Sequence, residues 1–172
     1  MIISLVGPPA GGKTTLAKAL CNKYGAKHLP IDDFRKSEAE LLQENFSHSA
    51  MNEIEISAWS KYILAIEESI KNNKITVIES TGTSWRMRHV YKVLKERKVI
   101  VIRLTAPKDI CVERFSSRGK PIFFPYDIAI EDTIDFTIKK TLNLNPDISI
   151  DTSLTDPEET ANRVVKILDT YL

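Results

Sequence analysis

A glycine-rich segment near the start of the chain constrains the fold more than any other feature of the sequence. An apolar run, residues 2–6, leads into a stretch with the spacing G-x-x-x-x-G-K-[ST]. Loops of this pattern follow a β-strand and open an α-helix, and their backbone N–H groups surround a phosphate. The sequence therefore predicts a phosphate-binding loop made by Gly7, Pro8, Pro9, Ala10, Gly11, Gly12, Lys13, Thr14 and Thr15.

The residues on both sides of the loop agree with this prediction. The preceding run is short and rich in β-branched residues, as in a buried strand. Beyond the loop, Leu16, Leu20 and Tyr24 recur every four positions, and Gly25 predicts the end of a helix. Lys13 can reach the outer phosphates of a nucleotide, and the Thr14 hydroxyl can hold Mg²⁺. We expect ATP and Mg²⁺ as ligands.

Strand and helix patterns alternate along the remaining sequence. Strands are predicted over residues 2–6, 27–31, 75–78, 99–104 and 148–150. Helices are predicted over 13–24, from near 34, over about 50–72 and 87–94, from 107 towards 115, and from 157 to 168 after a cap at Asp156. This alternation predicts an α/β fold of three layers, α/β/α, with a central parallel sheet. We expect residues 1–172 to form one domain, with ligands beyond the carboxyl ends of the strands.

Composition excludes several classes of protein. The chain is 42% hydrophobic and 27% charged, and no apolar run is long enough to cross a bilayer. Cys21 and Cys111 are too few for a disulfide scaffold, and no basic segment precedes the loop, so we expect a cytoplasmic protein without a membrane partner. The net charge of +1 does not indicate a general nucleic-acid surface. Basic residues are frequent over 86–120, and we interpret most of them as exposed helix faces.

Acidic and basic side chains follow the second predicted strand, in the block Asp32-Asp33-Phe34-Arg35. Transfer of a phosphoryl group to a hydroxyl needs a group that accepts the hydroxyl proton, and a carboxylate can do this. Asp32 or Asp33 can therefore act as the base, with the other among the acceptor-binding residues. Arg35 can hold a phosphate or carboxylate of the acceptor. Alternatively, Asp32 or Asp33 only caps the helix that is predicted near Phe34.

The third predicted strand leads to Glu79-Ser80-Thr81-Gly82. An acidic residue here can act on Mg²⁺ through water or can position the acceptor. Glu79 and Thr81 are therefore candidate acceptor-binding residues. Alternatively, this segment is a helix-entry loop whose hydroxyls serve turns and caps.

A further irregular segment predicts a lid over about residues 114–126. Arg114 and Arg118 are four residues apart, so they lie on one helix face, and a glycine, two prolines and paired aromatics follow them. Such arginines can neutralise charge during phosphoryl transfer, and a closed lid excludes water. Alternatively, they form a basic helix end that favours the helix dipole.

Three of these blocks together resemble a known group of enzymes. Residues 7–14, the Asp32-Asp33-Phe34-Arg35 block and the Arg114…Arg118-Gly119 pattern are similar to those of small P-loop kinases. Among these, the chain resembles the bacteriophage-type polynucleotide 5′-hydroxyl kinases. The resemblance implies a P-loop NTPase fold like that of nucleoside kinases. It also implies that Asp32 is the general base, that Arg35 contacts the acceptor phosphate, and that Arg114 and Arg118 contact the donor.

The resemblance favours a particular kind of reaction. It implies transfer of the γ-phosphate of ATP to a hydroxyl of a nucleic acid or nucleotide, as in a polynucleotide 5′-hydroxyl kinase or a phage-type modified-base DNA kinase. The alternatives are a small-metabolite kinase of the adenylylsulfate, gluconate or antibiotic type, or a zeta-toxin-like kinase of sugar nucleotides. The sequence indicates neither the acceptor nor the oligomeric state.

Overall fold

A five-stranded parallel sheet forms the centre of the computed structural model, which describes residues 1–41, 48–118 and 129–171. Its strands are β1 (Ile2–Val6), β2 (Lys27–Pro30), β3 (Thr76–Ser80), β4 (Val99–Thr105) and β5 (Ile148–Asp151). Their order across the sheet is β2-β3-β1-β4-β5. The strand that leads into the phosphate loop is therefore central, with neighbours on both sides.

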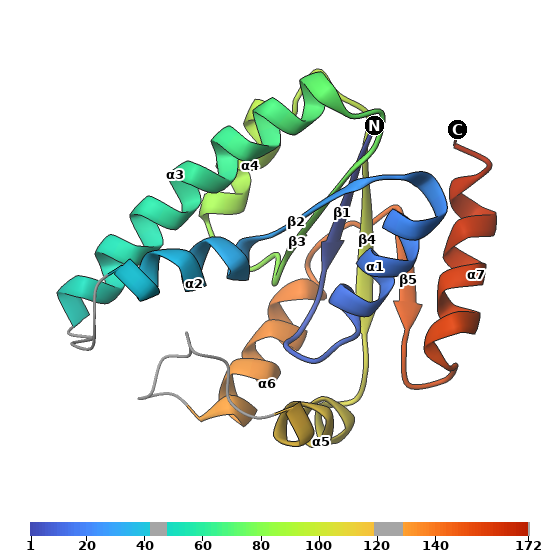
Figure 1. Cartoon of the computed structure of the whole chain (residues 1–172). Coiled ribbons are helices and arrows are strands. Elements are labelled where there is room, and N and C mark those ends of the chain that lie inside the picture. The colour runs from blue at the N-terminus through green and yellow to red at the C-terminus, as the bar shows by residue number, and fades with distance from the viewer. Residues whose placement is uncertain (42–47, 119–128, 172) are drawn as a thin grey trace.

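Helices cover both faces of the sheet, which confirms the predicted three-layer α/β/α fold (Figure 1). They are α1 (Lys13–Tyr24), α2 (Ile31–Leu41), α3 (His48–Asn72), α4 (Arg86–Val93), α5 (Lys108–Arg118), α6 (Ile130–Thr141) and α7 (Pro157–Leu168). Helices α1 and α7 lie on one face, and α3 and α4 lie on the other. Helix α2 packs along α3, and α5 packs on α6.

Alternation of side chains along β1 builds a core on each face. Ile3 and Leu5 pack with Leu16 of α1 and Val164 of α7, whereas Ile2 packs on the opposite side with Tyr62 of α3. All six side chains are almost completely buried. Burial of a large aliphatic side chain contributes about 1.5–3 kcal/mol. Because β1 is anchored on both faces, the loop that follows it starts from a fixed point.

The structure corrects two element boundaries and adds one helix. Helix α2 begins at Ile31, directly after β2, so Asp32 and Asp33 lie in its first turn and not in a loop before a helix at Phe34. This placement is favourable because carboxylates stabilise a helix N-terminus. Strand β3 continues to Ser80, which places Glu79 inside the sheet. Helix α6 was not predicted, although Ile130, Ile134 and Ile138 have helical spacing and pack in one apolar cluster.

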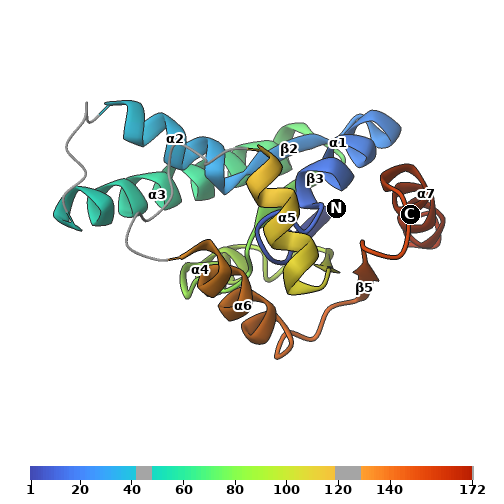
Figure 2. The ribbon, with the colours of Figure 1, turned by 90° about the horizontal axis from the view of Figure 1, so that it is seen from below.

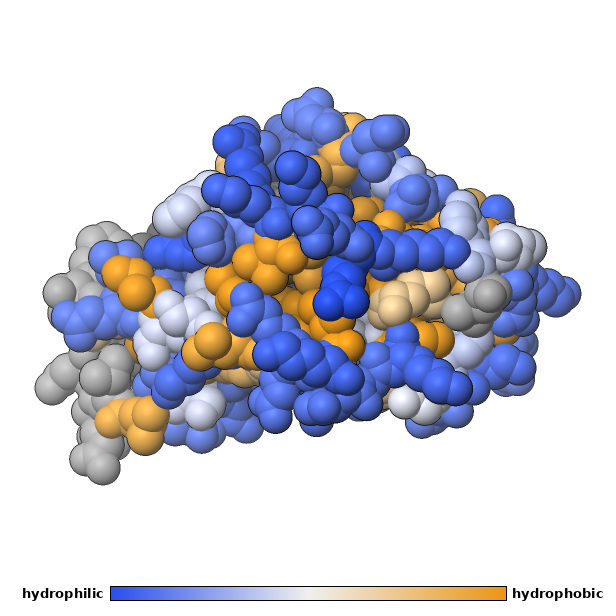
Figure 3. Space-filling model, turned by 90° about the horizontal axis from the view of Figure 1, so that it is seen from above, coloured by the Kyte–Doolittle hydropathy of each residue, from blue (hydrophilic) through white to orange (hydrophobic). Residues whose placement is uncertain are grey.

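The two ends of the sheet differ. Seen from below, the edge at the carboxyl ends of the strands carries the loop between β1 and α1, together with α5 and α6 (Figure 2). Seen from above, the opposite face has mostly hydrophilic side chains around a central zone of apolar ones (Figure 3). The predicted functional residues belong to the first of these edges. Among the described residues, no helix combines the length and the apolar character needed to cross a membrane.

Candidate active site

The phosphate loop has the backbone geometry that its glycines permit. Gly7 has φ +151°, and a Cβ there would lie 2.3 Å from the Leu104 carbonyl oxygen of β4. Gly12 has φ +88°, in the left-handed region that favours glycine. The Gly11 N–H donates to the Pro8 carbonyl at 3.1 Å, which closes the loop on itself. The motif therefore forms a tight turn that continues into α1.

Lys13 is buried over this loop. Its Nζ donates to the Pro8 carbonyl at 2.8 Å and to the Gly7 carbonyl at 3.2 Å. Burial lowers the pKa of the Lys13 ammonium, whereas the charges of Glu79 and Asp32 oppose this shift. Arg118 also lowers the pKa. Asp32 and Arg118, which come from different elements, therefore both lie close enough for their charges to act on Lys13.

Thr14 is held by a carboxylate of the neighbouring strand. Its Oγ1 donates to Glu79 Oε1 at 2.7 Å, and the second oxygen of Glu79 lies 2.9 Å from His28 Nε2 of β2. Burial opposes ionisation of Glu79, but hydrogen bonds from His28 and Thr14 and the charge of Lys13 hold the pKa of this carboxyl below its usual value. A hydroxyl fixed by an ionised carboxylate suits Mg²⁺, which prefers oxygen ligands. No cluster of three or more acidic, histidine or cysteine side chains forms a metal site within the described ranges.

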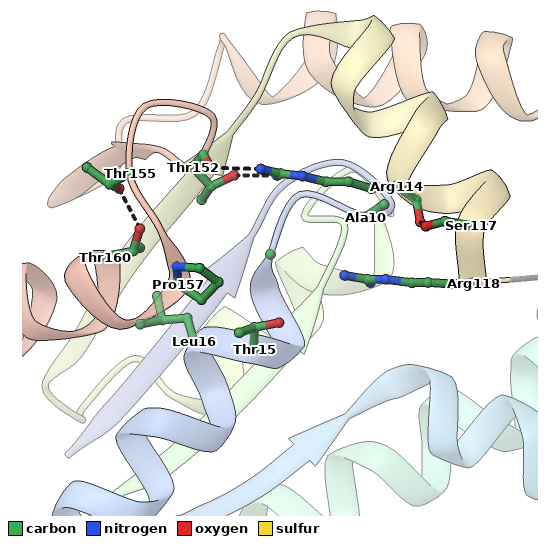
Figure 4. A pocket seen from close by; sticks show the side chains of 11 residues that line it. Ala10, Thr15, Leu16, Arg114, Ser117, Arg118, Thr152, Thr155, Pro157 and Thr160 are labelled. Carbon is green, nitrogen blue, oxygen red and sulfur yellow. Dashed lines mark hydrogen bonds between the residues drawn. The ribbon is translucent and has the colours of Figure 1, made fainter.

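A cavity of about 200 Å³ lies beside the phosphate loop (Figure 4). Three segments line it: the loop with the start of α1, the helix α5, and the segment that leads from β5 into α7. The lining residues are Ala10, Gly12, Thr15, Leu16, Arg114, Ser117, Arg118, Thr152, Thr155, Pro157 and Thr160. The segment after β5, which carried no site prediction above, therefore belongs to the cavity.

The two arginines of α5 differ in their contacts. Arg114 donates to Thr152 through Nη1, to the hydroxyl at 3.1 Å, and through Nη2, to the carbonyl at 2.9 Å. Thr152 Oγ1 also lies 3.3 Å from the Gly11 carbonyl, so Arg114 ties the segment after β5 to the phosphate loop. Arg118 is exposed and points towards the start of α1 (Figure 4). The rest of the predicted lid, residues 119–126, lies outside the described residues.

In helix α2, Arg35 is held by two carboxylates. Its Nε lies 2.6 Å from Glu55 Oε1 and its Nη2 lies 3.2 Å from Glu55 Oε2, which is a two-point ion pair between α2 and α3. Its Nη1 lies 2.9 Å from Asp32 Oδ1. Trp59 Nε1 also donates to Glu55, at 2.9 Å. Arg35 is therefore fixed in orientation, while the Asp32 side chain remains 80% exposed.

A second arginine reaches the same carboxylate from α4. Arg86 Nη1 lies 3.9 Å from Glu55 Oε2, which is an ion-pair distance but too long for a hydrogen bond. Its guanidinium also lies 4.8 Å from the ring centre of Trp85, which is 68% exposed. Arg86 is an exception among the basic residues of 86–120, most of which were interpreted as exposed helix faces, because its side chain is only 20% exposed.

The structure thus brings most of the predicted residues to one edge of the sheet. Three further residues that were not predicted lie with them. Glu55, Arg86 and His28 were not among the predicted site residues, because their partners are distant in the sequence and no motif marks them. Asp33 is exposed on the first turn of α2. Thr81 Oγ1 lies 2.9 Å from Thr83 Oγ1, in the loop after β3.

Comparisons with known proteins agree with this geometry. The model of the AAA domain family matches residues 3–123. A cytidylate kinase of Saccharolobus islandicus is 30% identical over 189 aligned positions, which cover 100% of this chain and 90% of that protein. A Pyrococcus furiosus protein assigned by inference as an adenylate kinase is 25% identical, over 98% of this chain and 84% of its own length. Among solved structures, shikimate kinase from Acinetobacter baumannii superposes with a TM-score of 0.68 at 18% identity, covering 99% and 93% of the two chains.

The matched region contains the phosphate loop, Lys13, Thr14, the acidic start of α2 and both arginines of α5. The relatives in sequence and the neighbour in structure are kinases that cover nearly the whole chain. The chain therefore belongs to the AAA domain family, and it is a small P-loop kinase.

Proposed function

We propose that this kinase transfers the γ-phosphate of ATP to a hydroxyl group of a small acceptor that carries a phosphate or a carboxylate. The observation that carries the proposal is the arrangement of Arg35 and Arg86, which reach Glu55 from different helices beside Asp32. This is the small-metabolite alternative of the sequence analysis. It replaces the nucleic-acid acceptor that the resemblance to polynucleotide kinases favoured.

On the donor side, the backbone amides of the loop and Lys13 would hold the phosphates of ATP. The Thr14 hydroxyl would bind Mg²⁺, and its hydrogen bond to Glu79 would fix its orientation. The ion, when bound, neutralises charge on the phosphate oxygens. Arg118 would stabilise the additional charge that develops during transfer. The cavity beside Thr152 would receive the base.

On the acceptor side, Asp32 would accept the proton of the attacking hydroxyl. Its side chain is exposed, and its charge acts on Lys13, so it lies within electrostatic reach of the donor site. Arg35 and Arg86 would bind the anionic group of the acceptor, because guanidinium groups match carboxylate and phosphate geometry. Glu55 and Trp59 keep Arg35 in place for this contact.

The names of the relatives agree with an anionic small molecule. Cytidylate and adenylate carry a phosphate, and shikimate carries a carboxylate. The near-neutral charge of this chain also agrees better with a small acceptor than with a polyanion. The adenylylsulfate, gluconate and sugar-nucleotide alternatives all have an anionic acceptor. The negative charge of the acceptor therefore does not distinguish between these alternatives.

Removing Arg86 should weaken acceptor binding specifically. We expect Arg86→Gln to raise the KM for the acceptor about 10- to 100-fold, the loss of one hydrogen bond to a charged group, with the KM for ATP nearly unchanged. Glu55 keeps its two-point pair with Arg35 in this variant, so the fold should persist. Arg88→Gln, an exposed arginine on the same helix, is the matched control. Equal KM values for Arg86→Gln and Arg88→Gln would remove Arg86 from the acceptor site.

Replacing Asp32 by asparagine should test the chemical nature of the acceptor group. If a hydroxyl attacks, Asp32→Asn should lower kcat by about 10²- to 10⁴-fold, the usual contribution of a general base. Asp33→Asn is measured beside it, because the sequence left either aspartate as the base and Asp33 is exposed one residue away. A fall in kcat in Asp33→Asn alone would move the role of the base to Asp33. If kcat is unchanged in both variants, neither aspartate is the base, which favours the second candidate, a nucleoside monophosphate kinase, whose acceptor is already a phosphate.

A panel of acceptors tests the proposal as a whole. Labelled ATP is incubated with Mg²⁺ and with nucleoside monophosphates, shikimate, gluconate, adenylylsulfate, a uridine diphosphate sugar, or an oligonucleotide that ends in a 5′-hydroxyl. We expect transfer to a hydroxyl of an anionic small molecule. Transfer only to the phosphate of the nucleoside monophosphates would favour the second candidate, and transfer to the oligonucleotide alone would overturn the proposal in favour of a polynucleotide kinase.

A further inference from the structure

We propose that His28 is a positioning residue for the Mg²⁺-binding hydroxyl of Thr14, acting through Glu79. The inference rests on the nucleotide and Mg²⁺ part of the proposed function and is independent of the acceptor. His28 lies on β2, outside the phosphate loop and outside the three sequence blocks that the kinase resemblance covers.

The sheet register brings His28 to Glu79. His28 pairs with Val77 across β2 and β3, and Glu79 follows Val77 by two residues. Because side chains alternate along strands, Val77 and Glu79 point to the same face, and His28 points with them. This is the face that α1 covers, and Thr14 lies in the first turn of that helix. The strand pairing therefore fixes the three side chains relative to each other.

The hydrogen bonds form a chain with one direction. Glu79 Oε1 accepts from the Thr14 hydroxyl at 2.7 Å, and Oε2 lies 2.9 Å from His28 Nε2. An ionised carboxylate can only accept, so Nε2 must carry a proton and donate. The two donors occupy different oxygens, which prevents rotation of the carboxylate. With its proton directed at Glu79, the Thr14 oxygen keeps its lone pairs available for a metal ion.

Burial makes this contact strong. The side chains of His28 and Glu79 are only 19% and 8% exposed. A carboxylate in such a site needs hydrogen bonds to remain charged. Without His28, Oε2 would need a new donor, and the simplest rearrangement turns the carboxylate away from Thr14. Loss of a residue that hydrogen-bonds to a metal-binding group typically lowers metal affinity by about 10- to 100-fold.

Two substitutions of His28, by glutamine and by asparagine, distinguish a positioning role of its side chain from a general effect on the stability of the fold. The amide nitrogen of glutamine in His28→Gln can reach the place of Nε2, whereas the shorter asparagine in His28→Asn cannot. His89→Asn is the matched control, because His89 is exposed on α4. Binding of a non-hydrolysable ATP analogue is measured by calorimetry, once with Mg²⁺ and once with a chelator, and thermal melting checks that each variant folds.

We expect His28→Asn to weaken binding in Mg²⁺ about 10- to 100-fold, with binding in chelator within about twofold of the wild type. His28→Gln should remain within about threefold of the wild type in both conditions. The proposal is overturned if His28→Asn binds as tightly as the wild type in Mg²⁺, if its binding weakens equally in chelator, or if His28→Gln is as weak as His28→Asn. Failure of the wild type to bind the analogue would instead count against the proposed function.

A measurement on the wild type does not depend on any variant folding. ¹⁵N NMR of labelled histidine reports which ring nitrogen carries the proton. We expect His28 to carry a proton on Nε2, directed at Glu79. A His28 ring that is protonated on Nδ1 alone could not donate to Glu79, and the proposal would then be wrong.

Discussion

Replacing Lys13 by alanine is expected to abolish phosphoryl transfer, with a fall in kcat of about 10³-fold or more. Lys13 is the buried cation of the phosphate loop, and its Nζ lies over the Gly7 and Pro8 carbonyls. Alanine removes the charge that would follow the outer phosphates during transfer. The check is the rate of γ-phosphate transfer from labelled ATP at saturating substrate.

Lys18→Ala is the matched control for Lys13→Ala. Lys18 lies on the same helix and is exposed, so its loss should change kcat less than twofold. Thermal melting should confirm that both variants fold. A Lys13→Ala enzyme that keeps a tenth of the wild-type kcat would mean that the loop does not hold the reacting phosphates.

Replacing Arg118 by alanine is expected to lower kcat about 100-fold or more, with a smaller effect on the KM for ATP. Arg118 is exposed and extends from α5 towards the start of α1, and its charge acts on Lys13. A guanidinium in this place stabilises charge that develops only in the transition state, and so its loss affects kcat. Pre-steady-state measurement of one turnover separates this effect from product release.

The control for Arg118→Ala is Lys108→Ala, because Lys108 is a cation at the opposite end of the same helix.

Arg114→Ala should differ from Arg118→Ala in its kinetic effect. Because Arg114 bonds Thr152, its loss should raise the KM for ATP more than it lowers kcat. An unchanged kcat in Arg118→Ala would exclude that residue from the transfer step.

The sequence allowed the architecture to be predicted because its signals are local. The strand before Gly7, the apolar spacing of α1 and the Asp156 cap of α7 each depend on neighbouring residues. The structure confirms this cap, since Asp156 accepts from the Glu158 and Glu159 amides at 2.8 and 2.9 Å. Helix α6 escaped prediction although its isoleucines have helical spacing, because its first turn adjoins the irregular segment that was interpreted as a lid.

The acceptor side could not be predicted in the same way, because its geometry depends on pairs that are distant in the sequence. Arg35 was expected to reach the acceptor directly, but its orientation is set by Glu55, twenty residues later. Arg86 meets the same carboxylate from 31 residues away. His28 was one of three scattered histidines, and only the register of β2 against β3 places it at Glu79. A sequence pattern contains none of these pairings.

Binding of ATP to the wild-type protein tests the central claim most directly. The protein is titrated with ATP in the presence of Mg²⁺ in a calorimeter, with Lys13→Ala as the comparison. The account predicts saturable binding of one ATP per chain with a Kd below about 1 mM, within the usual range for enzyme substrates, and much weaker binding by the variant. If neither ATP nor any other nucleoside triphosphate binds the wild type in Mg²⁺, the assignment of the phosphate loop as a nucleotide site is contradicted.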